Sequence, residues 1–157
     1  MQKPLSIFIA ASILLVGVYF LSQWKPGIEN LTNREIALSC TTHAAVSYHV
    51  HPELTLIIKG EKQIIPRDIG INALCMRAIH THTADGTIHI EAPHERDFTL
   101  ADFFAVWEKP FNETQILEYV ANEQYVVTMS VNGEVVDTYE NTILRDKDQI
   151  VIQYDKR

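Results

Sequence analysis

The segment over residues 78–91 constrains the fold of this chain more than any other, because a strong turn signal stands at its centre. Its Asp85-Gly86 dipeptide favours a two-residue type I′ turn, since glycine tolerates a positive φ and aspartate tolerates it better than most residues. Side chains alternate between the two faces of a strand, so the turn decides which residues share a face. The sequence therefore predicts a β-hairpin whose register follows from these two turn residues.

The predicted register gathers three histidines and one glutamate on a single face of the hairpin. His82 would oppose His89, and the Cβ atoms of opposed residues lie about 5 Å apart. His80 would oppose Glu91 on the same face. Three imidazoles and one carboxylate are a suitable ligand set for a divalent metal. With a turn of three or four residues the register would slip: His80 and His82 would still share a face, as would His89 and Glu91, but these two pairs could separate.

A second His-x-His pattern lies upstream, and six of the seven histidines fall within residues 43–89. The seventh, His94, is expected to be an exposed loop residue. Two alternatives remain: a polar acid–base site without metal, and a face of solvated side chains. We expect one metal site, formed by His80, His82, His89 and Glu91 with His49 or His51 nearby.

Two cysteines, Cys40 and Cys75, bracket the upstream histidine pair. In an exported domain an even number of cysteines most simply indicates a disulfide. In the chain-entropy model a loop of this length contributes about 3–4 kcal/mol. Metal ligation by both thiolates and two free thiols are the alternatives. Either bonded state would bring His49 and His51 towards the strand that begins at Cys75, which favours one composite site.

An uncharged apolar run extends from Leu5 to Leu21. At about 1.5 Å per residue a helix of this length covers roughly 25 Å, near the lower limit for spanning a bilayer. A cleaved signal peptide is the alternative, although no convincing small-x-small cleavage site follows the run. We expect an uncleaved anchor over 1–25 with its N-terminus inside, a linker over 26–38, and a periplasmic or extracellular domain over 39–157.

The part of the chain beyond Lys25 is strongly acidic. It holds all 20 acidic residues and 11 of the 13 basic residues, so its formal charge is 11 − 20 = −9. Nucleic acid as a partner is disfavoured, because it requires basic patches. The same charge favours the attraction of cations. The expected partners are a metal ion, the membrane through the N-terminal helix, and, as a further possibility, another membrane protein.

The remaining pattern predicts an α+β fold: an N-terminal transmembrane helix, then mainly antiparallel strands with one short packed helix. Thr99 can cap a helix over residues 99–107, whose apolar side chains recur at i, i+3, i+4 and i+7. The dipeptide Asn132-Gly133 predicts a second hairpin. The sequence contains no Gly-rich phosphate loop, no H-E-x-x-H and no G-x-S-x-G.

Several motifs together carry a resemblance over roughly residues 40–154. They are His49-Val50-His51-Pro52, Ile65-Pro66, Ile69-Gly70-Ile71, Cys75, His80-Thr81-His82, Gly86, Ile88-His89-Ile90-Glu91, Phe98 to Phe104, and Trp107. They resemble an uncharacterised family of membrane-anchored prokaryotic proteins. The family pattern has an aspartate after His-Thr-His where this chain has Thr83, so a ligand there would be lost. Separately, the segment from Tyr125 to Tyr154 is similar to the end of β-grasp domains, which implies fold only.

These observations predict a membrane-anchored, extracytoplasmic protein that binds Zn²⁺ or Cu²⁺ for delivery, sensing or support of a membrane partner. Imidazole suits both metals, and the affinity order alone favours copper. One alternative is a metal-dependent enzyme in which His80, His82 and Glu91 leave coordination positions open for substrate or water. The other alternative is a metal-free interaction module.

Overall fold

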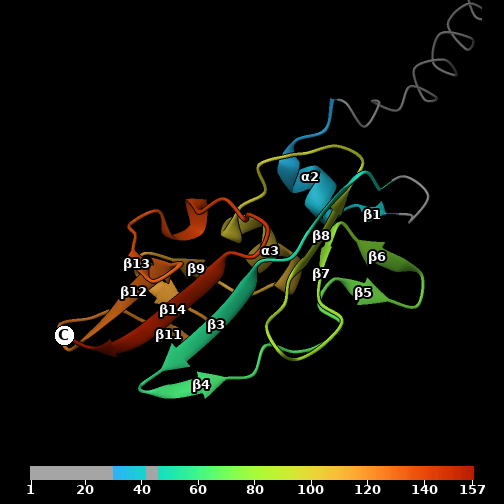
Figure 1. Ribbon diagram of the computed structural model, residues 1–157. Coiled ribbons are helices and arrows are strands. Elements are labelled where there is room, and N and C mark those ends of the chain that lie inside the picture. The colour runs from blue at the N-terminus through green and yellow to red at the C-terminus, as the bar shows by residue number, and fades with distance from the viewer. Residues whose placement is uncertain (1–29, 42–45) are drawn as a thin grey trace, which may run out of the picture. The chain divides into compact units, whose positions relative to one another are not determined.

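A computed structural model describes residues 30–41 and 46–157 of the chain (Figure 1). Residues 32–157 form one compact unit, and every element named below belongs to it. The expected anchor over residues 1–25 lies outside the described residues. Among those described, no helix is both long enough and apolar enough to cross a membrane.

The largest sheet has five strands in the order β13-β12-β14-β3-β4. Their bounds are Glu134–Val135 (β13), Tyr125–Val131 (β12), Gln149–Lys156 (β14), Glu53–Ile58 (β3) and Glu61–Gln63 (β4). The central pair, β14 and β3, is parallel, and the other neighbours are antiparallel. Alternate residues of β3 and β14 are buried, as expected for strands that cover a core with one face.

Two of the hairpins in this sheet have tight two-residue turns. Asn132 and Gly133 both have positive φ, 53° and 87°, and they join β12 to β13. Lys59 and Gly60 do the same between β3 and β4, with φ of 53° and 82°. Positive φ at both central residues is the signature of a type I′ turn. The hairpin predicted at Asn132-Gly133 is therefore confirmed.

Three small sheets complete the strands of the described part. The first has the order β2-β8-β7, the second β1-β6-β5 and the third β11-β10-β9. Their bounds are Tyr48–Val50 (β2), His89–Ala92 (β8), Ile79–His80 (β7), Cys40–Thr41 (β1), Cys75–Arg77 (β6), Ile71–Asn72 (β5), Tyr119–Val120 (β11), Gln115–Ile116 (β10) and Phe111–Asn112 (β9). The predicted disulfide between Cys40 and Cys75 is confirmed, and it joins β1 to β6.

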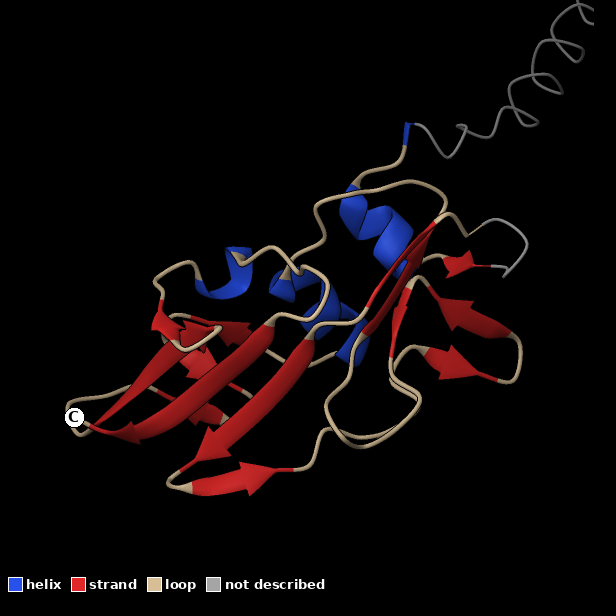
Figure 2. Ribbon diagram, in the orientation of Figure 1, coloured by secondary structure: helices blue, strands red, loops and turns tan. Residues whose placement is uncertain are grey.

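Helices are few, as the colouring in Figure 2 makes plain. The predicted helix is present as α3 (Leu100–Trp107), which packs against β7 and against α2 (Asn33–Leu38). A short 3₁₀ helix, η3 (Tyr139–Asn141), also contacts α3. Helix α2 lies within the segment expected to be a linker, and its Ile36 and Ala37 are buried. The fold class is thus α+β with mainly antiparallel strands, as predicted.

The hairpin predicted over residues 78–91 forms with a different register. Ile79 pairs with Ile90 and His80 pairs with His89, so residues 81–88 make a long connection in place of a two-residue turn. The observed register differs from the predicted one by two positions. Because side chains alternate with a period of two, this shift leaves the same residues on the same face.

Tertiary contacts of Gly86 explain the difference. Its carbonyl accepts a hydrogen bond of 2.9 Å from the Leu54 backbone N–H at the start of β3. A Cβ atom at Gly86, where φ is 99°, would stand 2.2 Å from the Leu54 carbonyl oxygen. The neighbouring Asp85 accepts hydrogen bonds from the Thr87 backbone and the Thr83 hydroxyl. The dipeptide therefore holds a loop against β3 and does not close a hairpin.

Candidate metal centre

Five histidines from the first part of the domain converge in space. They are His49 on β2, His51 just after β2, His80 at the end of β7, His82 in the following loop, and His89 on β8. Their ring nitrogens form two overlapping groups, in each of which the ligand atoms lie within 4.8 Å of one another. We call His80, His82 and His89 the inner triad, and His49, His51 and His89 the outer triad. β7 and β8 lie side by side in Figure 1, as their pairing requires.

His80 is fully buried and is oriented by the backbone. Its Nδ1 lies 2.9 Å from the carbonyl oxygen of Arg77. A carbonyl oxygen can only accept, so Nδ1 carries the proton and Nε2 of the neutral ring presents a lone pair. A hydrogen bond to the distal ring nitrogen is also the usual way in which proteins orient a metal-binding histidine.

The lone pair of His80 faces a second imidazole. Nε2 of His80 lies 3.1 Å from Nε2 of His82. Two arrangements give such a distance: a hydrogen bond donated by His82, or two lone pairs directed at one cation. Ligand nitrogens on a tetrahedral Zn²⁺, each about 2.0–2.1 Å from the ion, lie roughly 3.3 Å apart. The pair therefore already has the spacing that a shared metal requires.

His89 stands between the other four histidines. Its ring centroid is 4.6 Å from that of His51 and 4.7 Å from that of His82. The corresponding distances to His80 and His49 are 5.4 Å and 5.9 Å. Its Nδ1 is buried and has no hydrogen-bond partner among the described residues. A buried polar atom without a partner is costly, and a bound ion is one way to satisfy it.

The cluster keeps its central imidazoles neutral. Burial, reinforced by the charges of His51 and the other histidines, lowers the pKa of His89 to about 4. Burial also lowers the pKa of His80, an effect partly opposed by its bond to the Arg77 carbonyl and by the charge of Glu91. Only the neutral imidazole can bind a metal, so both rings are in the binding form at neutral pH.

Two carboxylates lie beside the outer triad. Nε2 of His49 is 3.3 Å from Oε1 of Glu91, which is only 5% exposed. Nδ1 of His51 is 3.9 Å from Oδ1 of Asp146, and the His51 backbone N–H donates to the same oxygen at 3.0 Å. These contacts place negative charge next to the His49 and His51 rings.

Glu91 occupies a different place from the one predicted. It pairs with His49 on β2 across the sheet, whereas the sequence placed it opposite His80. In the described part of the chain it is a member of neither triad. His89 thus takes the position at His80 that the predicted register gave to Glu91, and Glu91 supports the outer histidines.

Thr81, between His80 and His82, ties these two histidines to the segment over residues 66–70. Its hydroxyl donates to the Pro66 carbonyl at 2.9 Å and accepts from the Ile69 backbone at 3.1 Å. Its own N–H donates to the Ile69 carbonyl. Gly70 follows in the same loop, and a Cβ there would stand 2.5 Å from the Ile79 carbonyl oxygen. The segment over residues 66–70 therefore packs tightly against Ile79 and His80.

His94 is exposed in a bend after β8, as predicted. The disulfide removes both cysteines from the set of possible metal ligands. Sequence reasoning missed Asp146, which lies in a charged turn far along the chain, and the carbonyl of Arg77. The Asp146 contact joins segments 95 residues apart, so no local pattern marks it, whereas the Arg77 contact spans only three residues and belongs to no recognisable motif.

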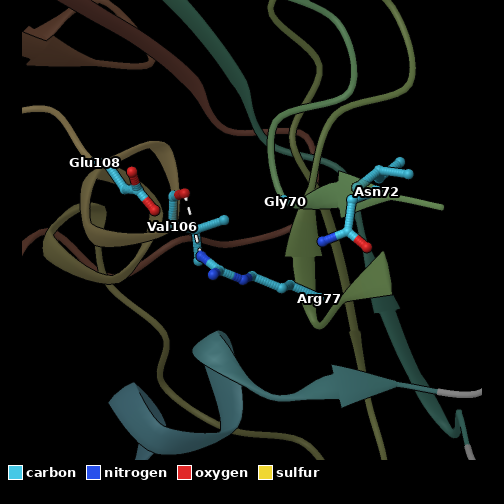
Figure 3. A pocket seen from close by; sticks show the side chains of 6 residues that line it. Gly70, Asn72, Arg77, Val106 and Glu108 are labelled. Atoms are coloured by element: carbon cyan, nitrogen blue, oxygen red, sulfur yellow. Dashed lines mark hydrogen bonds between the residues drawn. The ribbon is translucent and has the colours of Figure 1, made fainter. Parts of the chain in front are cut away.

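A cavity of about 150 Å³ lies near the cluster but contains none of its histidines (Figure 3). It is lined by Gly70, Ile71, Asn72, Arg77, Val106 and Glu108. The guanidinium of Arg77 spans it and donates to the Val106 carbonyl at 3.4 Å. Arg77 thus contributes its side chain to this cavity and its carbonyl to His80.

Comparisons with protein-family models, with curated protein sequences and with solved structures found no match for this chain. Its function is therefore inferred from the geometry of the site.

Proposed function

We propose that this domain binds a divalent transition metal ion, Zn²⁺ or Cu²⁺, through the inner triad of His80, His82 and His89. The observation that carries the proposal is the orientation of His80. Its Nδ1 is bound to the Arg77 carbonyl, and its Nε2 faces the His82 nitrogen at 3.1 Å. A carbonyl partner on one ring nitrogen and a metal on the other is a recurrent arrangement in metalloproteins.

The electrostatics of the domain support the same function. The lowered pKa values of His80 and His89 keep both rings neutral, so no proton competes with the ion for these two ligands at pH 7. The net charge of the chain is −7, which favours the approach of a cation. Imidazole ligands suit both metals, and the general affinity order favours copper where both are present.

Metal titration of the full-length protein in detergent tests the proposal. After treatment with a chelator, we expect Zn²⁺ and Cu²⁺ to bind with micromolar or tighter affinity. His82→Ala removes one ligand of the inner triad, an exposed ring, and should weaken binding at least 10-fold. His94→Ala should leave the affinity unchanged. Equal affinities of the two variants, or no binding to the wild type at micromolar metal, would contradict the proposal.

A metal-dependent enzyme is the second candidate, and the size of the inner triad favours it. Three histidines leave a fourth position on a tetrahedral ion, as in catalytic zinc sites. The visible spectrum of the Co²⁺-substituted protein separates the two functions. A change on addition of azide would indicate an open position for water or substrate. An unchanged spectrum would indicate a closed site for storage, delivery or structure.

We further propose that the domain is held at a membrane by an uncleaved helix over residues 5–21 and lies on the extracytoplasmic side. The uninterrupted apolar run and the disulfide between Cys40 and Cys75 support this location, since disulfides persist in oxidising compartments. Mass spectrometry of the mature N-terminus from the native host is the test. A mature chain that starts between Ser22 and Glu29 would contradict retention of the anchor.

We also propose that the largest sheet has a β-grasp-like arrangement. The strand order β13-β12-β14-β3-β4 supports it, with β3 and β14 parallel at the centre and α3 between the two hairpins in the sequence.

We propose in addition that the chain belongs to the family of membrane-anchored prokaryotic proteins that its motifs resemble. A β-grasp-like sheet could also dock a membrane-protein partner, which cross-linking in intact membranes would reveal.

A further inference from the structure

Building on the proposed metal site, we infer that the cluster is a binuclear centre. The second ion is bound by the outer triad of His49, His51 and His89, and the imidazole of His89 lies between the two ions. The inner triad alone accounts for one ion and leaves His49 and His51 without a role. The following observations assign them one.

Distance prevents all five histidines from serving one ion. Two nitrogens bound to the same Zn²⁺ at about 2.0–2.1 Å can lie no more than roughly 4.2 Å apart. Within the described residues the ring nitrogens fall into two groups that share only His89, and neither group combines the His49/His51 pair with the His80/His82 pair. His89 alone belongs to both. One ion therefore cannot use both pairs, whereas two ions can.

The position of His89 fits a bridge. Its ring lies 4.6 Å from His51 on the outer side and 4.7 Å from His82 on the inner side. Its Nδ1 is buried without a hydrogen-bond partner among the described residues, so this nitrogen is not committed to the protein. When both nitrogens of an imidazole bind metals, the ring N–H bond breaks and its proton passes to solvent. The resulting imidazolate donates one lone pair to each ion.

Two carboxylates lie beside the outer triad, where they would compensate the charge of a second ion. Two dications a few ångströms apart repel one another, so a binuclear centre requires nearby anions. Glu91 lies 3.3 Å from the His49 ring, and Asp146 lies 3.9 Å from the His51 ring. Both carboxylates flank the outer triad. The imidazolate of His89 would supply a further negative charge between the ions.

The two positions differ in access to solvent. The side chains of His49 and His51 are 46% and 40% exposed, whereas His80 is fully buried. His82 in the inner triad is exposed, which leaves a route for the first ion. We therefore expect the inner triad to bind first and the outer triad to bind second with lower affinity.

Copper titration followed by electron paramagnetic resonance tests the inference on the full-length protein in detergent. Elemental analysis of the wild type at saturation should give two Cu²⁺ per chain. The signal of the second ion should couple magnetically to the first through the His89 ring, so the integrated intensity should fall below that of two isolated ions. The His49→Ala/His51→Ala variant should bind one Cu²⁺ with the intensity of one isolated ion.

Controls and outcomes separate this inference from the proposed function. His94→Ala should keep two ions and the coupled signal, and circular dichroism should show that both variants are folded. One ion per chain in the wild type would overturn the binuclear centre and leave the proposed function standing. Two ions with uncoupled signals would overturn the shared His89. No bound metal at all would overturn the proposed function itself.

Discussion

At the residue scale, Gly86 shows how one position can suit two different structures. An aspartate–glycine pair is suited to a tight turn, but here the glycine allows the loop to lie directly against the backbone of β3. A Cβ atom would meet the Leu54 carbonyl oxygen at 2.2 Å, and backbone atoms in a paired strand cannot move aside cheaply. Gly60 has a similar φ, 82°, but open space around it.

This contrast predicts the stability of two matched variants. Gly86→Ala should lower the free energy of unfolding by about 3 kcal/mol or more, because steric overlap adds to the strain of a positive φ. Gly60→Ala should cost only about 1 kcal/mol, since it carries the strain alone. Urea unfolding followed by circular dichroism measures both. Equal losses would mean that the loop yields and that its contact with Leu54 is not rigid.

A second prediction at this scale concerns the pH dependence of the metal-free protein. The pKa of His89 falls from about 6.5 in the unfolded chain to about 4 in the folded protein. The unfolded state therefore binds more protons in this range, and stability declines as the pH falls from about 6.5 to about 4. For a ring that is only partly buried we expect a loss of about 1–2 kcal/mol.

Urea unfolding in the presence of a chelator, at pH 7.5 and pH 5, measures this decline. His89→Gln removes the titrating ring and should flatten the pH dependence, while His94→Gln should keep it. A wild-type protein that gained stability on acidification would contradict the assigned direction of the His89 pKa shift.

At the scale of elements, the N-terminus of α3 is joined to α2. Asp102 accepts hydrogen bonds from the backbone N–H and the hydroxyl of Thr99, the N-cap residue, so both donors of the cap are satisfied. Its other oxygen accepts from Nε of Arg34 on α2 at 2.7 Å. Asp102 is only 5% exposed, so these partners compensate a buried charge.

Asp102→Ala should therefore lower the free energy of unfolding by about 2–3 kcal/mol, because the cap and the ion pair are lost together. Glu35→Ala, which removes the equivalent exposed partner of Thr32 at α2, should cost less than about 1 kcal/mol. Thermal unfolding monitored by circular dichroism compares the two. Similar losses would show that the contact between α2 and α3 contributes little.

At the scale of the whole molecule, the disulfide links the start of the domain to the strand that leads into the histidine cluster. Cys40 and Cys75 are separated by 35 residues, and the loop between them contains His49 and His51. A cross-link restricts the unfolded chain over this whole stretch. In the chain-entropy model the resulting stabilisation is about 3–4 kcal/mol.

The Cys40→Ser/Cys75→Ser variant should lose about this much stability in urea unfolding. Its folded state should still bind metal through the inner triad, because no cysteine belongs to that triad. The wild type, denatured without reductant, should show no free thiols on labelling. A variant of unchanged stability would show that the cross-link does not stabilise the protein by restricting its unfolded chain.

Sequence alone determined the features that depend on neighbours along the chain. The Asn132-Gly133 turn, the helix that begins after Thr99 and the mainly antiparallel α+β class all follow from local patterns, and the structure has them. The pairing of Cys40 with Cys75 was also predicted, from an even cysteine count in a domain expected to be exported, and the structure has it. Each of these rests on backbone preference or on a count, which packing elsewhere does not alter.

Only the tertiary structure decided how the histidines meet. The connection over residues 81–88 is long because its glycine packs on β3, and this contact overrides the turn preference of Asp85-Gly86. Alternation with a period of two kept His80 and His89 together despite the shifted register. Glu91 lies opposite His49, and not opposite His80 as predicted, because β2 pairs with β8. No local pattern specifies this contact between distant segments. Local propensity sets the candidates for a site, and long-range packing selects which of them share it.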